Sequence, residues 1–121
     1  MKRLILPIPP SINHCYIYAR GKRIKNKDAN IYEEEAIWKT RMFVKKNKKF
    51  PDKTKIICKM WYFFPDNRRR DTHNTFKILF DAIEKGGLYK DDKYVMPWVM
   101  DFTVDRDNPR LEMEFIEFKE I

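Results

Sequence analysis

The chain has few of the residues that mark disulfide-rich or zinc-binding proteins. Its 121 residues include two cysteines and two histidines. No secretory signal is evident, so we expect Cys15 and Cys58 to be reduced thiols and not a disulfide framework. Together with His14 and His73 they could supply four zinc ligands. The four lack the paired short spacing of structural zinc sites, which argues against that use.

Long apolar runs and linkers are also missing. No segment reaches the length needed to span a membrane, and Pro7 interrupts the short apolar stretch at residues 4–8, which lacks the apolar region of a signal peptide. We therefore expect a cytoplasmic protein with no membrane association and no small-molecule cofactor. A length of 121 residues suits one domain, residues 1–121.

Acidic residues are outnumbered over most of the chain. Hydrophobic residues make up 43% of the sequence, enough for a core, so the 36% charged residues describe a surface and not disorder. Residues 1–100 carry 23 basic and 11 acidic side chains, a net charge of +12, whereas residues 101–121 carry 3 and 7, a net charge of −4. This asymmetry favours a polyanionic partner, with nucleic acid preferred over a membrane surface.

Residues 68–92, RRRDTHNTFKILFDAIEKGGLYKDD, combine several chemistries in one short span. Three arginines, Arg68, Arg69 and Arg70, precede Asp71 and His73. Lys77 follows on an amphipathic segment, and the acidic pair Asp91 and Asp92 comes after a Gly-Gly break. A cationic run beside several metal-type ligands is what a metal-dependent enzyme acting on a phosphate backbone needs.

The spacing inside this span predicts a helix. Phe76, Leu79, Phe80 and Ile83 form one apolar stripe, and Asn74, Lys77, Asp81 and Glu84 form a neighbouring polar one. We expect Thr72 or Asn74 to cap its start and Gly86-Gly87 to end it. The ammonium of Lys77 would then lean back toward residues 71–74, where the helix dipole favours a phosphate.

These residues resemble the signature of the RusA-type Holliday junction resolvases. That signature has a basic run, Asp-x-Asp-Asn, a Lys three residues after the Asn, and a later Asp-Asp. Here it reads RRR at 68–70, DTHN at 71–74, Lys77, and DD at 91–92, and the chain also opens like the family with Pro9-Pro10-Ser11 and Asn13. One position departs from the pattern, because His73 stands where the second Asp is usual.

The resemblance implies a metal-dependent endodeoxyribonuclease that cuts four-way DNA junctions, and the residues fit that chemistry. Carboxylates are natural ligands for Mg²⁺, and an imidazole suits Mn²⁺ better. The expected metal ligands are Asp71, His73, Asp91 and Asp92, and the expected catalytic residues are Asp71, Lys77, Asp91 and Asp92. Lys77 would neutralise charge on the phosphoryl oxygens or orient the attacking water.

Two basic regions are expected to hold the DNA backbone. The first is the arginine run, and the second is a basic loop or hairpin that follows a short strand at residues 15–19. The expected DNA-binding residues are Asn13, Arg20, Lys22, Arg23, Lys25, Arg68, Arg69, Arg70 and Asn74.

The remaining pattern predicts an α+β fold of order β-β-α-β-α-β-β. Strands are expected at residues 3–8, 15–19 and 55–64, a helix at 29–46, and a final hairpin at 94–118 in which Pro97 marks an edge strand or a bulge. We expect one small mixed sheet of four or five strands with two helices packed on one face.

Two alternatives to the junction resolvase remain open. One is a non-catalytic DNA-binding module in which the acidic residues are structural, and the other is a related nuclease that cuts flaps or other branched DNA. A four-way junction is roughly two-fold symmetric, so the resolvase hypothesis also predicts a homodimer that places two active sites on one face.

Overall fold

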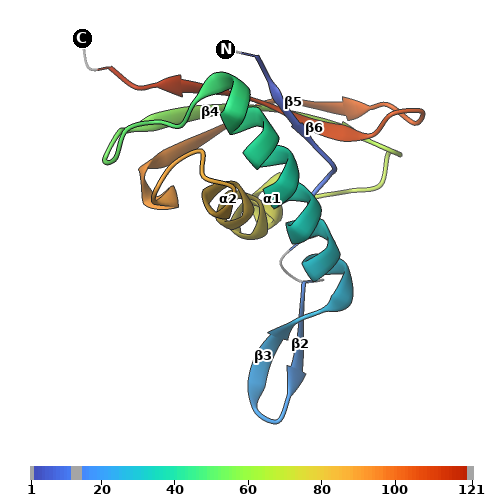
Figure 1. Cartoon of the computed structure of the whole chain (residues 1–121). Coiled ribbons are helices and arrows are strands. Elements are labelled where there is room, and N and C mark those ends of the chain that lie inside the picture. The colour runs from blue at the N-terminus through green and yellow to red at the C-terminus, as the bar shows by residue number, and fades with distance from the viewer. Residues whose placement is uncertain (1, 12–14, 120–121) are drawn as a thin grey trace.

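The computed structural model describes residues 2–11 and 15–119, and its centre is a four-stranded mixed sheet (Figure 1). The strands are β1 (Leu4–Leu6), β4 (Ile56–Phe64), β5 (Val95–Val104) and β6 (Arg110–Glu117). Their order is β1-β6-β4-β5, with β4 and β5 parallel and the other neighbours antiparallel. The α+β prediction of a small mixed sheet is confirmed.

Strand β4 lies at the middle of the sheet and supplies much of the core. Its residues alternate between buried and half-buried, as expected for a strand with one face against helices. Cys58, Met60 and Tyr62 are completely buried on that inner face. Burial raises the pKa of the Cys58 thiol, so this cysteine is an inert core residue.

The predicted hairpin at residues 94–118 is wrong, because β4 lies between β5 and β6 and pairs with both. The connection between β5 and β6 instead crosses the end of β4, where the Asp105 amide donates to the Phe64 carbonyl oxygen at 2.8 Å. β4 is nine residues long and buries every second side chain, and its backbone pairs along both edges, which suits this central position. Pro97 does lie on an edge strand, as predicted.

Both long helices, α1 (Lys27–Asn47) and α2 (Phe76–Lys85), cover the same face of the sheet (Figure 1). They approach closely because small residues meet between them. A Cβ atom added to Gly86, at the end of α2, would lie 2.5 Å from the Cβ of Thr40 on α1. None of the described helices is long and apolar enough to cross a membrane.

A separate two-stranded hairpin, formed by β2 (Tyr16–Ala19) and β3 (Lys22–Lys25), projects from the body (Figure 1). Its turn residues Arg20 and Gly21 both have positive φ, 53° and 73°, as a tight two-residue turn requires. The strand predicted at residues 15–19 therefore exists, but it pairs with the basic segment and not with the main sheet.

Candidate active site

The start of α2 is set by a short 3₁₀ helix, η2 (Thr72–Thr75), that packs on β4. The Thr75 hydroxyl donates to the Thr72 carbonyl oxygen at 2.7 Å and lies 2.7 Å from the Tyr62 hydroxyl in the core. The cap predicted at Thr72 or Asn74 is instead made by Asp71, whose Oδ1 accepts a hydrogen bond from the His73 amide at 3.0 Å. Asp71 is thus held in a defined position at the helix start.

His73 lies beside Asp71 at the surface. Its Nδ1 is 3.5 Å from Asp71 Oδ1, its side chain is 77% exposed, and its ring contacts Phe76 with centroids 5.1 Å apart. The two predicted ligands therefore form a neighbouring pair that solvent reaches freely.

The polar stripe predicted on α2 exists and leads from this pair toward the second acidic region. Lys77 Nζ lies 4.0 Å from Asp81 Oδ2, one turn further along the helix. Asp81 in turn helps to raise the pKa of the Asp92 carboxyl, so the stripe reaches the second acidic region. Lys77 thus stands between the Asp71 end and the Asp92 end of the site.

The second acidic region forms where the chain folds back after α2 into a short 3₁₀ helix, η3 (Asp92–Tyr94). The turn is anchored by the buried hydroxyl of Tyr89, which donates to the Phe80 carbonyl oxygen at 2.8 Å. Glu84 Oε1 accepts a hydrogen bond from the Asp92 amide at 2.7 Å, and Asp91 Oδ1 accepts one from the Lys93 amide at 3.0 Å.

This region contains a group of potential metal ligands. Oxygen atoms of Glu84, Asp91 and Asp92 all lie within 4.8 Å of one another. Burial raises the pKa of the Asp92 carboxyl to about 6, assisted by the hydrogen bond with Asp81 and by the negative charges of Asp81, Glu84 and Asp91. The carboxylates repel one another, so a divalent cation would relieve a real electrostatic cost.

The predicted ligands therefore divide into two pairs. Asp91 and Asp92 belong to the clustered group, whereas Asp71 and His73 do not, within the part of the chain that the structure describes. Sequence reasoning missed Glu84 and Asp81 as members of the site. Their place on the polar stripe was visible, but nothing local indicated that residues 91–92 fold back onto it.

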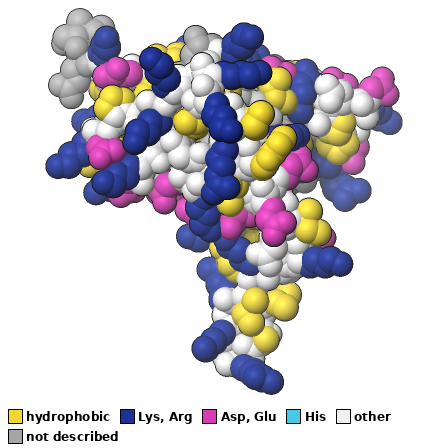
Figure 2. Space-filling view, viewed as in Figure 1, with side chains coloured by type: hydrophobic (Ala, Val, Ile, Leu, Met, Phe, Trp, Pro, Cys, Tyr) yellow, Lys and Arg dark blue, Asp and Glu magenta, His cyan; other side chains and the backbone are white. Residues whose placement is uncertain are grey.

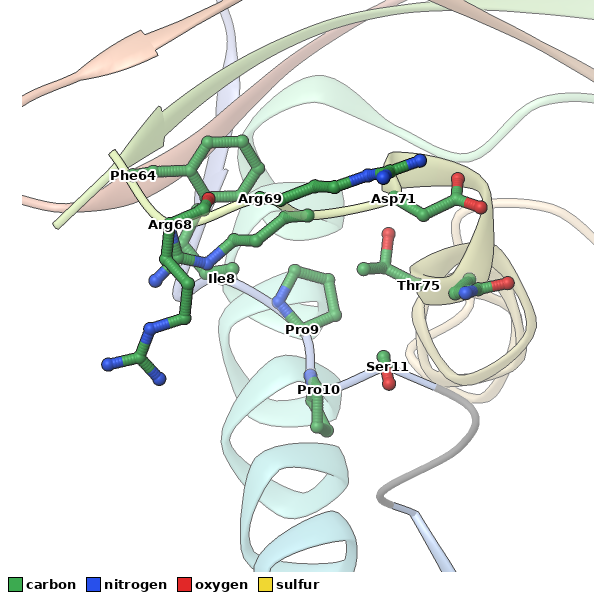
Figure 3. A pocket seen from close by; sticks show the side chains of 11 residues that line it. Ile8, Pro9, Pro10, Ser11, Phe64, Arg68, Arg69, Asp71 and Thr75 are labelled. Atoms are coloured by element: carbon green, nitrogen blue, oxygen red, sulfur yellow. The ribbon is translucent and has the colours of Figure 1, made fainter. Parts of the chain in front are cut away.

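A pocket of about 420 Å³, which we call the arginine pocket, adjoins Asp71 and brings the Pro9-Pro10-Ser11 opening of the chain together with the arginine run. Figure 3 shows two segments facing each other across this pocket. One carries Pro9, Pro10 and Ser11, and the other carries Arg68, Arg69 and Asp71. The full lining is Ile8, Pro9, Pro10, Ser11, Phe64, Arg68, Arg69, Arg70, Asp71, Asn74 and Thr75. Its walls are both cationic and apolar, as suits a nucleotide backbone with its sugar.

The three arginines are not equivalent. Arg70 makes an ion pair with Asp66 at 2.8 Å and lies over the Phe64 ring at 4.9 Å, so it helps to fold the loop. All three arginines line the pocket and also a second pocket that reaches Phe102 on β5, but among the described residues Arg68 and Arg69 have no such ion pair. We therefore expect these two to matter most for DNA contact.

The other predicted DNA-binding residues lie elsewhere. Asn13 falls outside the described residues. The hairpin residues do not line the arginine pocket and stand on the projecting ribbon (Figure 1); they are Arg20, Lys22, Arg23 and Lys25.

Comparison with known proteins places this arrangement in a family. The family model described as Endodeoxyribonuclease RusA matches residues 7–116. The chain is 34% identical over 117 residues to the crossover junction endodeoxyribonuclease RusA of Escherichia coli strain K12, covering 94% of this chain and 92% of that protein. The protein of the same name from Enterobacteria phage 82 shows the same identity and coverage. The matched region includes both pairs of predicted ligands, Lys77 and the arginine pocket, and the chain belongs to the RusA family of endodeoxyribonucleases.

Proposed function

We propose that this protein is a metal-dependent, structure-specific endodeoxyribonuclease that resolves four-way DNA junctions by paired phosphodiester hydrolysis. The observation that carries the proposal is the position of the arginine pocket and Asp71 at one end of the polar stripe of α2, with the carboxylates of residues 84, 91 and 92 at the other. The names of the relatives, crossover junction endodeoxyribonucleases, support the same substrate.

The donor set at η3 fits a hard divalent cation. Three carboxylates within 4.8 Å of one another are the oxygen ligands that Mg²⁺ prefers, and their partial exposure leaves room for water ligands. We assign Glu84, Asp91 and Asp92 to this site, and we keep Asp71 and His73, which lie outside the group, as a separate pair of candidate ligands at the start of η2. A bound Mg²⁺ or Mn²⁺ would neutralise charge on the scissile phosphate and lower the pKa of a bound water.

The side chains around the carboxylates hold and orient the DNA. Arg68 and Arg69 hold phosphates in the pocket beside Asp71. Lys77, half-exposed and 4.0 Å from Asp81, is placed to neutralise charge that develops on the phosphoryl oxygens. Asn74 lines the same pocket and is placed to donate to a phosphate or sugar oxygen.

A second copy of the chain is part of the proposal. The described residues hold one group of clustered carboxylates, whereas resolution requires cuts on two opposing strands. The face of the sheet opposite the helices offers an apolar row, because Ile57 of β4 pairs with Ile116 of β6 and Met96 of β5. Trp98 stands next to this row and is 49% exposed. We assign the dimer interface to this row.

Analytical ultracentrifugation of Trp98→Glu tests the dimer. A charge buried within an apolar interface is strongly unfavourable, so the variant should sediment as a monomer at micromolar concentration, whereas the parent sediments as a dimer. Asn108→Glu, in the exposed turn between β5 and β6, is the matched control for adding one negative charge. A parent that is monomeric and still resolves junctions fully would contradict the dimer.

The function itself is tested with labelled four-way junction, flap and linear duplex DNA of shared sequence, with and without Mg²⁺ or Mn²⁺. We expect paired cuts in the junction with metal and no cutting in EDTA. Faster cutting of flaps than of four-way junctions would show that the protein is instead the related nuclease that acts on other branched DNA. If the protein binds branched DNA but cuts none of it with either metal, the protein is instead a non-catalytic DNA-binding module.

A further inference from the structure

The β2–β3 hairpin is unusually exposed for a regular element. None of its eight strand residues is buried, five of them are exposed, and Tyr18 is 81% exposed. Figure 2 shows hydrophobic side chains on the projecting part with Lys and Arg side chains at its far end. A two-stranded ribbon by itself is only marginally stable in water, so exposed aromatic residues on it point to contact with something else.

The hairpin is nevertheless fixed firmly at its base. The Asn26 amide donates to the Cys15 carbonyl oxygen at 2.7 Å, and Asn26 Oδ1 caps α1 by accepting from the Ala29 amide at 2.8 Å. Lys25 forms an ion pair with Glu33 on α1. These contacts attach the ribbon to the start of α1 and fix the direction in which it projects from the body of the protein.

Strand register gives the hairpin two different faces. Cross-strand partners share a face, so Tyr18 lies with Arg23 and Tyr16 lies with Lys25, while Ile17 and Ile24 lie on the opposite face. The Arg23 guanidinium stacks 3.9 Å above the Tyr16 ring. One face therefore alternates aromatic rings with cations, the composition of surfaces on which nucleic acid bases stack.

We propose that the Tyr18 and Arg23 face of this hairpin stacks on bases exposed at the branch point of a DNA junction and so distinguishes branched DNA from linear duplex. In a linear duplex every base is stacked between neighbours, whereas a branch point interrupts stacking and offers the face of a base. Arg20 and Lys22, at the turn, carry positive charges that complement the negative charge of the adjoining DNA phosphates. This inference rests on the proposed junction-cutting function.

The test measures affinity for a four-way junction and for a linear duplex of the same sequence, in EDTA so that neither is cut. Tyr18→Ala should lose affinity for the junction by about five- to a hundredfold, the range expected for one stacked base, with little change for the duplex. Tyr18→Phe, which keeps the ring, should bind like the parent. Ile17→Ala, on the opposite face, is the matched control and should also bind like the parent.

A junction with 2-aminopurine beside the branch point supplies a second readout, because stacking on tyrosine quenches this fluorescent base. The parent and Tyr18→Phe should quench it and Tyr18→Ala should not. Equal loss of junction and duplex affinity in Tyr18→Ala, or no loss at all, would overturn the inference. So would conversion of the dimer to a monomer by this change, which would assign the face to a protein contact. If the parent cuts junctions, these failures leave the proposed function intact.

Discussion

The carboxylate of Glu84 on α2 accepts a hydrogen bond from the backbone amide of Asp92 at 2.7 Å. This contact brings the segment after the Gly-Gly turn back onto the polar stripe of the helix. It joins residues eight apart in the sequence and forms the group of carboxylates to which we assign the metal.

Glu84→Gln separates a ligand role from a purely structural one. Glutamine keeps an oxygen that can accept from the Asp92 amide but removes a negative charge. We expect thermal stability without metal to remain close to that of the parent, and affinity for Mn²⁺ in calorimetric titration to fall by about ten- to a hundredfold. Glu35→Gln, on the exposed side of α1 in a pair with Lys39, controls for loss of one helical carboxylate. Unchanged Mn²⁺ affinity would leave Glu84 a structural residue.

His73 should tune the choice of metal. Its imidazole lies 3.5 Å from Asp71 and suits Mn²⁺ better than Mg²⁺. We expect His73→Asp to raise the ratio of Mg²⁺-supported to Mn²⁺-supported cleavage, and His73→Ala to lose most activity with Mn²⁺. Equal Mg²⁺-supported rates for His73→Ala and the parent would rule out the ligand role.

Arg69 should contribute affinity and not chemistry. It lines the pocket beside Asp71, so Arg69→Ala should weaken DNA binding and lower the slope of log affinity against log salt by about 0.9, the value for one phosphate contact. Binding isotherms at several salt concentrations measure this slope. Arg106→Ala, in the turn between β5 and β6, is a control for loss of a cation outside the pocket lining. A slope equal to that of the parent would remove Arg69 from the interface.

Gly86 should be required for close packing of the two helices. The added methyl group in Gly86→Ala would lie 2.5 Å from the Cβ of Thr40, so the helices must move apart. We expect the free energy of unfolding to fall by about 1–3 kcal/mol. Gly87→Ala meets no atom within 4 Å and acts through its φ of +93° alone, which predicts a smaller loss of about 1 kcal/mol. Urea denaturation of both variants measures the difference.

Glu33 should make part of the stability depend on pH. Burial would raise its pKa, but hydrogen bonds and charge from Lys25 and Lys85 lower the pKa below its usual 4.5. The carboxylate therefore stabilises the fold above pH 4.5, and this contribution is lost as pH falls through the lowered value. Glu33→Gln should be less stable than the parent by about 1 kcal/mol at pH 7, with the difference shrinking below pH 4.5. A difference independent of pH would contradict this role.

Local patterns in the sequence were enough to predict the helix that carries the site. The apolar stripe through Leu79 and Ile83 is buried, and the adjoining polar stripe holds Lys77 and Asp81 at the surface. The edge position of Pro97 also followed from a local property, its missing amide hydrogen.

Contacts that depend on long-range pairing could not be predicted. Strand adjacency in sequence favoured a β5–β6 hairpin, but pairing was decided by β4, which both strands flank. The buried stripe of α1 runs through Ala29, Tyr32, Ala36, Thr40 and Phe43, while Trp38 remains 62% exposed. The approach of α2 decides the size of the residue at position 40, because Thr40 lies directly against Gly86. Membership of Glu84 in the acidic group likewise depends on the fold of residues 86–92.

One comparison tests the central claim most directly, namely binding of a four-way junction in EDTA and its cleavage in Mg²⁺, by the parent and by Asp92→Asn. Asparagine removes a ligand charge beside Glu84 and leaves the arginine pocket unchanged. The account predicts that Asp92→Asn binds the junction at least as tightly as the parent, because one carboxylate no longer repels the phosphates, while cleavage is abolished. Cleavage by Asp92→Asn at the rate of the parent would contradict it.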